Sequence, residues 1–364
     1  VSDMGGPWIR KDWLETIGLD VPQTYDDYEK VLSAIKNTYG TSQPIGLSGT
    51  VFASGSYLCG GYNCLPASDM LSNHGFYHVD GTVLYGAVQD EFQELLTRMH
   101  RWYELGLINS DYLSKDMMSG MNDFASGDIG IFYGGQEMMP SVLAMGQAID
   151  ENFTVTAIPD PVQNTGDKRH LADYNASRVT TSGAVAILAC SEYPDLACQY
   201  IDFAFSEEGA MVANYGVEGE TYYIDSDGSI KFTELVTDYS DSAPIMVALG
   251  IYVWYSGPFY QYSDKLDYMY DAAITDAQSV WTENIAVDDL WMFPDSFGLS
   301  ADAEERFAEI YSDIATYCEE SIDKFIVGDL SIEDDFETFR SNIYNMGLDK
   351  CIEIYQQAYD SANA

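Results

Sequence analysis

Helical and strand patterns alternate along most of this chain, and that alternation limits its possible folds more than any other feature. Apolar residues recur at helical spacing over residues 24–40 and again over residues 89–105. Short apolar runs bounded by Gly, Pro or Ser predict strands at Ile129–Tyr133, Thr154–Ile158 and Ala184–Ala189. Strands that alternate with helices are buried beneath them, so the sequence predicts an α/β fold.

Capping residues predict where several helices begin and end. Thr24 is a good N-cap, because Asp27 stands three residues later and can complete a capping box. The last third of the chain is predicted to be helical over Ser300–Phe325, Ser331–Tyr344 and Gly347–Tyr359. These local signals predict a helical C-terminal region.

The chain is long for a single hydrophobic core. It has 364 residues, and single cores stop growing near about 250 to 300 residues, so the length favours two domains. A polar stretch from Pro159 to Gly183 predicts a long loop that crosses between them. The longest apolar stretch, Ala243 to about Tyr255, falls short of the ~18 to 20 residues that a membrane-spanning helix needs.

The charge balance excludes one class of partner. The 16 Lys and Arg stand against 59 Asp and Glu, which gives a formal charge of −43. A polyanion would be repelled by such a chain, so nucleic acid is excluded as a partner. Six cysteines are too sparse for a disulfide scaffold, and we expect most of them to be free, buried thiols.

No motif in the sequence predicts a metal, a cofactor or a catalytic centre. Asp225, Asp227 and Gly228 resemble the start of a calcium loop, but the later ligands do not follow, so a β-hairpin turn explains them better. His74 and His78 are four residues apart with a turn signal between them, which disfavours a metal site. Carboxylate pairs for glycoside hydrolysis stay open, since so many acids guarantee chance pairs.

Aromatic side chains are numerous, and they are more informative about function than the acidic residues. The sequence has 28 Tyr and 6 Trp, and several stand in loop segments beside Gly and Asn. Flat rings beside amides and carboxylates suit a sugar, whose C–H faces stack while its hydroxyls form hydrogen bonds. Core packing is the alternative for most rings, and surface solvation is the alternative for Glu218. The candidate ligand contacts are Tyr57, Tyr62, Asn63, Tyr133, Gln136, Glu218, Trp254 and Tyr255.

Five segments in order resemble one family across nearly the whole chain. They are Trp8–Leu14 with its continuation to Tyr28, then Phe124–Gly135, Tyr215–Gly228, Lys324–Asp329 and Asn345–Asp360. Together they resemble extracellular solute-binding proteins of bacterial ABC importers, in the carbohydrate-binding group that includes aldouronate and lipo-oligosaccharide transport proteins. In related maltose-binding proteins a sugar-stacking aromatic follows the strand at 129–133, where Tyr133 or Gln136 stands here.

The resemblance implies a two-lobed periplasmic-binding-protein fold of the second type, with one lobe incomplete and a ligand cleft between lobes. Residues 1–182 and 243–364 would form the C-terminal-type lobe, which ends in helices. Residues 183–242 would be a remnant of the N-terminal-type lobe and should expose an apolar patch that drives association. By the same analogy the protein is extracellular, and it meets the membrane only through a lipid anchor that this chain does not contain.

The implied function is capture of an oligosaccharide for delivery to the permease subunits of an ABC importer. No cofactor and no catalysis are expected. The alternatives are a carbohydrate-active hydrolase, suggested by the acids and rings, and a sensor domain of the same fold. The acidic charge argues against anionic uronate ligands, unless local cations such as Arg10 or Arg178 outweigh it.

Overall fold

The chain divides into two units in the computed structural model. Unit 1 comprises residues 1–135, 142–176 and 277–364, and unit 2 comprises residues 136–141 and 177–276. The assignment of residues 1–182, 183–242 and 243–364 to particular lobes stays a prediction. The structure describes residues 2–3, 5–41, 43–47, 58–65, 74–109, 111–171, 174–175, 185–240, 250–254, 257–260, 262, 276–294 and 297–363.

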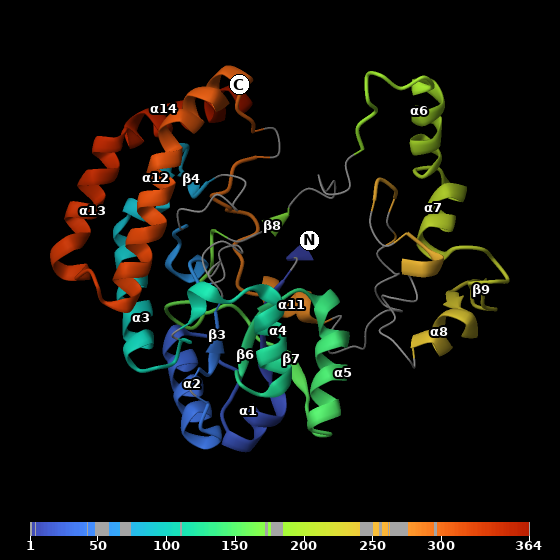
Figure 1. Ribbon diagram of the computed structural model, residues 1–364, viewed down its shortest axis with the longest axis horizontal. Coiled ribbons are helices and arrows are strands. Elements are labelled where there is room, and N and C mark those ends of the chain that lie inside the picture. The colour runs from blue at the N-terminus through green and yellow to red at the C-terminus, as the bar shows by residue number, and fades with distance from the viewer. Residues whose placement is uncertain are drawn as a thin grey trace. The chain divides into compact units, whose positions relative to one another are not determined.

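A four-stranded sheet organises unit 1 (Figure 1). Its order is β3 (Ile45–Gly46), β6 (Ile131–Gly134), β2 (Gly6–Arg10) and β7 (Val155–Ala157). Strand β2 runs antiparallel to both neighbours, whereas β3 runs parallel to β6. The strands predicted near residues 129–133 and 154–158 are therefore confirmed as β6 and β7.

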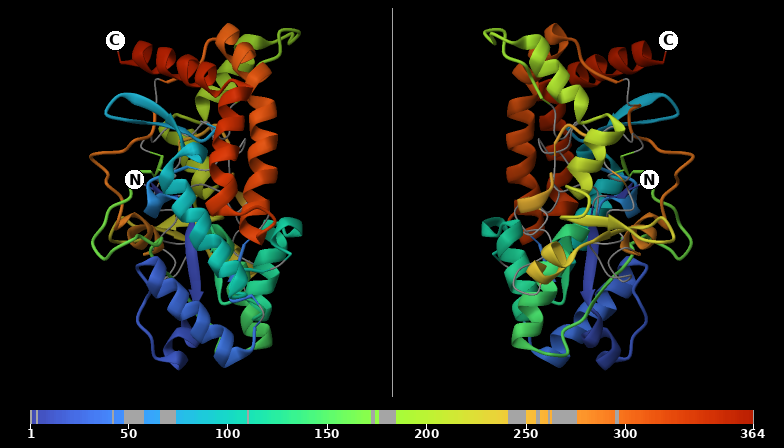
Figure 2. Two further views of the ribbon diagram at one scale, coloured as in Figure 1. Left: turned by 90° about the vertical axis from the view of Figure 1, so that its left-hand side faces the viewer. Right: turned by 90° about the vertical axis from the view of Figure 1, so that its right-hand side faces the viewer.

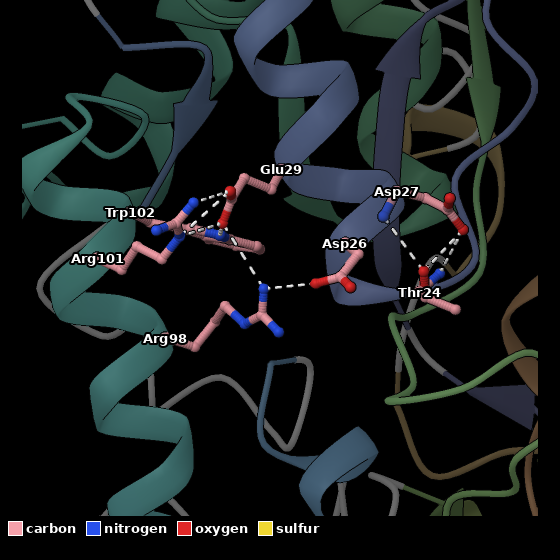
Figure 3. Close-up of polar contacts among 7 residues, drawn as sticks. All are labelled: Thr24, Asp26, Asp27, Glu29, Arg98, Arg101 and Trp102. Carbon is pink, nitrogen blue, oxygen red and sulfur yellow. Dashed lines mark hydrogen bonds and ion pairs between the residues drawn. The ribbon is translucent and has the colours of Figure 1, made fainter.

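Helix α2 (Tyr25–Tyr39) begins with the predicted capping box. The Thr24 hydroxyl accepts a hydrogen bond from the Asp27 N–H, and the Asp27 carboxylate accepts one from the Thr24 N–H (Figure 3). The helix ends at Gly40, whose φ of 69° is in the left-handed region. The other helices before residue 150 are α1 (Lys11–Ile17), α3 (Asp90–Glu104), α4 (Met117–Ser126) and α5 (Met139–Ile149).

The C-terminal helices are α12 (Ala301–Val327), α13 (Ile332–Met346) and α14 (Leu348–Ala362). Ser300 and Ser331 cap α12 and α13 with their side chains, and Gly347 ends α13 at a φ of 111°. The predicted helical C-terminal region is therefore confirmed. Helix α12 packs against α3, and α14 packs on the hairpin of β4 (Phe76–Val79) and β5 (Thr82–Tyr85) (Figures 1 and 2).

Arg169 forms a buried ion pair and also joins the segments of unit 1 that precede and follow residues 177–276. The Arg169 guanidinium lies 3.0 Å from an Asp160 carboxylate oxygen, and both side chains are fully buried. Arg169 also donates to the Asn284 side chain and to the Trp281 carbonyl, each at 2.8 Å. Burial raises the pKa of Asp160 to about 6, although the charge of Arg169 acts in the opposite direction.

Two short strands and one helix lie where the chain leaves unit 1 and where it returns to it. Strand β1 (Ser2–Asp3) pairs antiparallel with β8 (Tyr174–Asn175) just before the chain enters unit 2. Helix α11 (Ala277–Thr282) is the first element of unit 1 after the chain returns. Its Trp281 is fully buried and meets the Trp8 ring edge-to-face at 5.3 Å.

Unit 2 contains α6 (Pro194–Phe203), α7 (Glu207–Tyr215), α8 (Glu234–Ser240) and a hairpin of β9 (Tyr222–Ile224) with β10 (Ile230–Phe232). The predicted hairpin turn at residues 225–228 is confirmed. The predicted strand Ala184–Ala189 is wrong for its described residues, because 185–189 form no strand and Val185 and Leu188 are exposed. An apolar run becomes a buried strand only beside other strands, and no described strand pairs with this one.

None of the helices within the described residues is both long enough and apolar enough to cross a membrane.

The six cysteines are free thiols, but they differ in exposure. Cys59, Cys64, Cys318 and Cys351 are buried as expected, whereas Cys190 and Cys198 are exposed in unit 2. Burial raises the pKa of Cys318 and of Cys351 to about 12, which suppresses the reactive thiolate.

We expect a thiol reagent at pH 8 to modify two cysteines, Cys190 and Cys198, rapidly and the other four only after unfolding in urea. Rapid modification of all six would contradict this placement.

Candidate functional site

The described residues of unit 2 line a hollow of about 600 Å³. Small-molecule sites commonly fall between about 300 and 1,000 Å³. Aliphatic side chains from the segment after residue 184 and from α6 form most of its wall, and two aromatic rings complete it. The lining residues are Val185, Ala186, Ile187, Leu188, Cys190, Ser191, Ala197, Tyr200, Ile201, Ala204, Trp254 and Pro258.

Trp254 is the predicted site residue that lies in this hollow. Its backbone N–H donates to the Ala213 carbonyl at 2.9 Å, which ties it to α7. Its ring lies 6.3 Å from the Tyr200 ring and meets Phe259 edge-to-face at 5.8 Å. The side chain nevertheless stays 39% exposed. A ring that is held in place and is still exposed to solvent can stack on the C–H face of a sugar.

Tyr62 and Asn63 lie in unit 1 and have structural partners. Tyr62 is buried with its ring 4.7 Å from that of Tyr25, and burial raises the pKa of its phenol. Asn63 ends a short 3₁₀ turn with a φ of 52°, and its side-chain oxygen accepts a hydrogen bond from the His170 N–H at 2.8 Å. Asn tolerates this left-handed conformation better than most residues, which explains its presence at the turn.

Tyr133 and Gln136 are both buried at and just after the end of β6. Tyr133 belongs to the same hydrophobic core as Tyr62 and Trp102. Core packing, the alternative named above for most rings, therefore accounts for Tyr62 and Tyr133. A ring in or beside a turn is part of the core whenever it points inward, and sequence position alone does not reveal that direction. Whether these residues contact a ligand stays a prediction.

Of the other candidates, the structure describes Glu218. Glu218 is exposed in a turn before β9, where its charge contributes to the raised pKa of Tyr222, after the larger effect of burial. Tyr57 and Tyr255 lie outside the described residues. Tyr200 was not among the predicted contacts, because its spacing with Leu196 and Ala204 is typical of the buried face of a helix.

Helix α6 in fact buries none of its residues. Leu196 is 62% exposed, Tyr200 63% and Phe203 46%, and they recur at helical spacing, so they form an apolar stripe. Contiguous exposed apolar surface of this kind is uncommon on monomeric proteins and promotes association.

We expect this stripe to make the 364-residue chain associate with itself at high concentration. Leu196→Glu should lower the apparent mass in sedimentation equilibrium towards that of one chain, because a charge in the stripe must be desolvated on contact. Leu235→Glu adds the same charge to α8 at a residue that is 48% exposed, and it should leave association unchanged. Equal effects of the two variants would show that total charge, and not the stripe, controls association.

Ion pairs between α2 and α3 engage both arginines of α3, Arg98 and Arg101 (Figure 3). Glu29 accepts hydrogen bonds from Arg101 at 2.7 Å and from the indole N–H of Trp102 at 3.1 Å. Arg98 donates to Asp26 at 2.7 Å. The hydrogen bonds from Arg101 lower the pKa of Glu29, which keeps it ionised. These residues form a network that joins two helices.

Comparison with known proteins gives a family match and several relatives. Residues 4–211 match the family model described as bacterial extracellular solute-binding protein. The lipoprotein LipO of Bacillus subtilis is 26% identical over 239 residues, which cover 62% of this chain and 45% of LipO. The fructooligosaccharide ABC transporter substrate-binding protein FusA of Streptococcus pneumoniae is 23% identical over 381 residues, which cover all of this chain and 66% of FusA. The chain thus spans less than two thirds of LipO and of FusA.

Solved structures show the same fold. The alginate-binding protein AlgQ2 without calcium superposes with a TM-score of 0.73 and 18% identity, covering 98% of this chain and 72% of its own. A solute-binding protein of Bifidobacterium longum infantis, described as binding human milk oligosaccharides, gives a TM-score of 0.72 and 17% identity, covering 99% and 74%. The predicted α/β fold of the two-lobed, type II periplasmic-binding class is therefore confirmed. The incompleteness of one lobe stays a prediction.

Proposed function

The chain belongs to the family of bacterial extracellular solute-binding proteins, and from this premise we propose that it captures a carbohydrate for an ABC importer. The family match over residues 4–211 is the observation that carries the proposal, and it confirms the family predicted from the five ordered segments. It also confirms the predicted extracellular setting. The proposed partners are the permease subunits of the importer, and a lipid anchor on the whole protein is proposed by analogy with LipO.

An oligosaccharide is the proposed ligand class. FusA is named for fructooligosaccharides, and the solved structures include a complex of FusA with kestose. In this chain the partly exposed ring of Trp254, beside Tyr200, supports a stacking role. The hollow of about 600 Å³ has room for sugar rings. The candidate contacts from the sequence, with Trp254 foremost, remain the proposed contacts. The protein is proposed to bind its ligand without changing it.

Calorimetry of the 364-residue chain against a panel of oligosaccharides tests this function. We expect at least one sugar to bind, and analysis of the sugar afterwards should find it intact. Turnover of any sugar would support the hydrolase alternative and overturn the proposal. Failure of every sugar in the panel to bind would also count against it.

Trp254→Ala should weaken binding of that sugar by about 1 to 3 kcal/mol, or about 5- to 150-fold, because a central stacking ring is lost. Tyr223→Ala is the matched control, since Tyr223 is another exposed ring of unit 2 that does not line the hollow. Thermal unfolding of both variants shows whether they fold. A folded Trp254→Ala variant with unchanged affinity would remove Trp254 from the site while leaving the family assignment intact.

A further inference from the structure

We infer that the carbohydrate is uncharged, so that the site takes a neutral oligosaccharide and excludes uronate oligomers. This inference rests on the proposed function and narrows its ligand class. It depends on where the basic side chains lie, since a carboxylate ligand needs a positively charged group to replace its hydration.

Unit 2 has very few basic residues. Over residues 136–141 and 177–276 the sequence has three, Arg178, Lys231 and Lys265, against 17 Asp and Glu. Lys231 is the basic residue of this unit within the described ranges, and it stands on β10. There its charge adds to the hydrogen bonds from Ser229 that lower the pKa of Asp227. It is also absent from the lining of the hollow at Trp254.

In unit 1 the described arginines already have carboxylate partners, with one exposed exception. Arg10 is buried, 2.5 Å from Asp12 and 3.3 Å from Asp150, with its guanidinium over the rings of Trp13 and Phe153. The remaining pairs are Arg98 with Asp26, Arg101 with Glu29, Arg169 with Asp160 and Arg340 with Asp90. The exception, Arg306, lies exposed on α12.

Several lysines of unit 1 also have polar partners, whereas Lys30 and Lys350 are exposed. Lys115 pairs with Asp123 at 2.7 Å. Lys36 and Lys168 donate to backbone carbonyls, those of Leu105 and Glu283. Arg10, a local cation that could have favoured a uronate, is therefore already neutralised, and Arg178 lies outside the described residues.

A uronate ligand would face two costs that a neutral sugar avoids. At every described arginine except the exposed Arg306, its carboxylates would have to displace an internal Asp or Glu from the guanidinium, and bidentate arginines are the usual receptors for carboxylates. It would also approach a chain with a formal charge of −43, whose field repels anions at low salt. Neutral sugar hydroxyls, in contrast, donate hydrogen bonds readily to the abundant carboxylates.

The test compares charged with neutral ligands, including one set, the oligogalacturonates and their methyl esters, that shares a sugar backbone and differs in charge. Calorimetry would use oligogalacturonates and their methyl esters, together with oligoalginates and neutral fructooligosaccharides and milk oligosaccharides, at low and physiological salt. We expect a neutral sugar to bind, and every uronate oligomer to bind about 100-fold or more weakly than the best neutral sugar, as expected for an uncompensated charge. For the galacturonates, methyl esterification should not weaken binding.

A uronate oligomer that binds as tightly as the best neutral sugar, with or without added Ca²⁺, would overturn the inference and leave the proposed function standing. If no sugar of either kind binds, the proposed function itself fails, and the inference fails with it. The two failures are therefore distinguishable in one series of titrations.

Discussion

Replacing Arg169 by Met should lower the free energy of unfolding by about 3 to 5 kcal/mol, because the Asp160 carboxylate is then left buried without a compensating charge. The pair is enclosed on all sides, with exposed fractions of 1% for Arg169 and 0% for Asp160. The substitution also removes the hydrogen bonds that Arg169 donates to the Asn284 side chain and to the Trp281 carbonyl. Urea unfolding followed by circular dichroism measures the loss.

The loss should depend on pH in a defined direction. Burial already raises the pKa of Asp160 to about 6 in the presence of Arg169, and without Arg169 the pKa rises further. A carboxyl group with a raised pKa holds its proton in the folded chain at a pH where the unfolded chain has released it, so its contribution to stability falls as pH rises. The Arg169→Met variant should therefore lose more stability at pH 8 than at pH 5.

Two further variants separate this explanation from a general effect of removing an arginine. Arg101→Met breaks an ion pair with Glu29 in which the Arg101 side chain is 59% exposed, and it should cost far less, since water screens and replaces that guanidinium. Asp160→Asn combined with Arg169→Met removes both charges and should be less damaging than the sum of the single variants. Additive losses, or a pH-independent loss in Arg169→Met, would show that the buried charge does not govern stability here.

Local signals predicted the local elements well. The Thr24 and Asp27 pattern predicted the capping box of α2, and the Asp225 to Gly228 sequence predicted the turn between β9 and β10. Each signal is complete within a few residues, because caps and turns are stabilised by hydrogen bonds between near neighbours. Such elements need no knowledge of distant parts of the chain.

Predictions that depended on distant partners were less successful. The run Ala184–Ala189 has the composition of a buried strand, yet its described residues are exposed without strand neighbours. Tyr62 and Tyr133 stand beside Gly or Asn in the sequence, yet their rings enter the core around Tyr25 and Tyr28. The composition of a segment shows whether it could be buried. Tertiary packing determines which of the suitable segments are in fact buried.

The same distinction applies to the candidate site. Trp254 was predicted from its surroundings of Tyr, Ser, Gly and Pro, and the structure places it in the hollow of unit 2. Tyr200, its neighbour at 6.3 Å, was missed because its helical spacing looked like that of a core residue. An exposed helix face and a buried one have the same apolar period, so the sequence could not distinguish them.

Trp281→Ala should be about as destabilising as the arginine substitution, with an expected loss of about 3 to 5 kcal/mol for a buried Trp. The Trp281 indole is fully buried, meets Trp8 edge-to-face and donates its N–H to the Pro7 carbonyl at 3.3 Å. Through these contacts Trp281 joins α11 to β2 where the chain returns from unit 2. Urea unfolding of the single variant measures the loss.

The backbone of β2 provides an independent check of this packing. A Cβ at Gly6 would lie 2.5 Å from the Trp281 indole, so Gly6→Ala should destabilise the protein although it adds only one methyl group. In the Trp281→Ala background the same methyl group enters the space left by the ring, and its cost should largely disappear. A double-mutant cycle therefore predicts strong coupling between the two positions. If Gly6→Ala is equally costly in both backgrounds, the indole is not what restricts residue 6, and the seating of α11 on β2 must depend on other contacts.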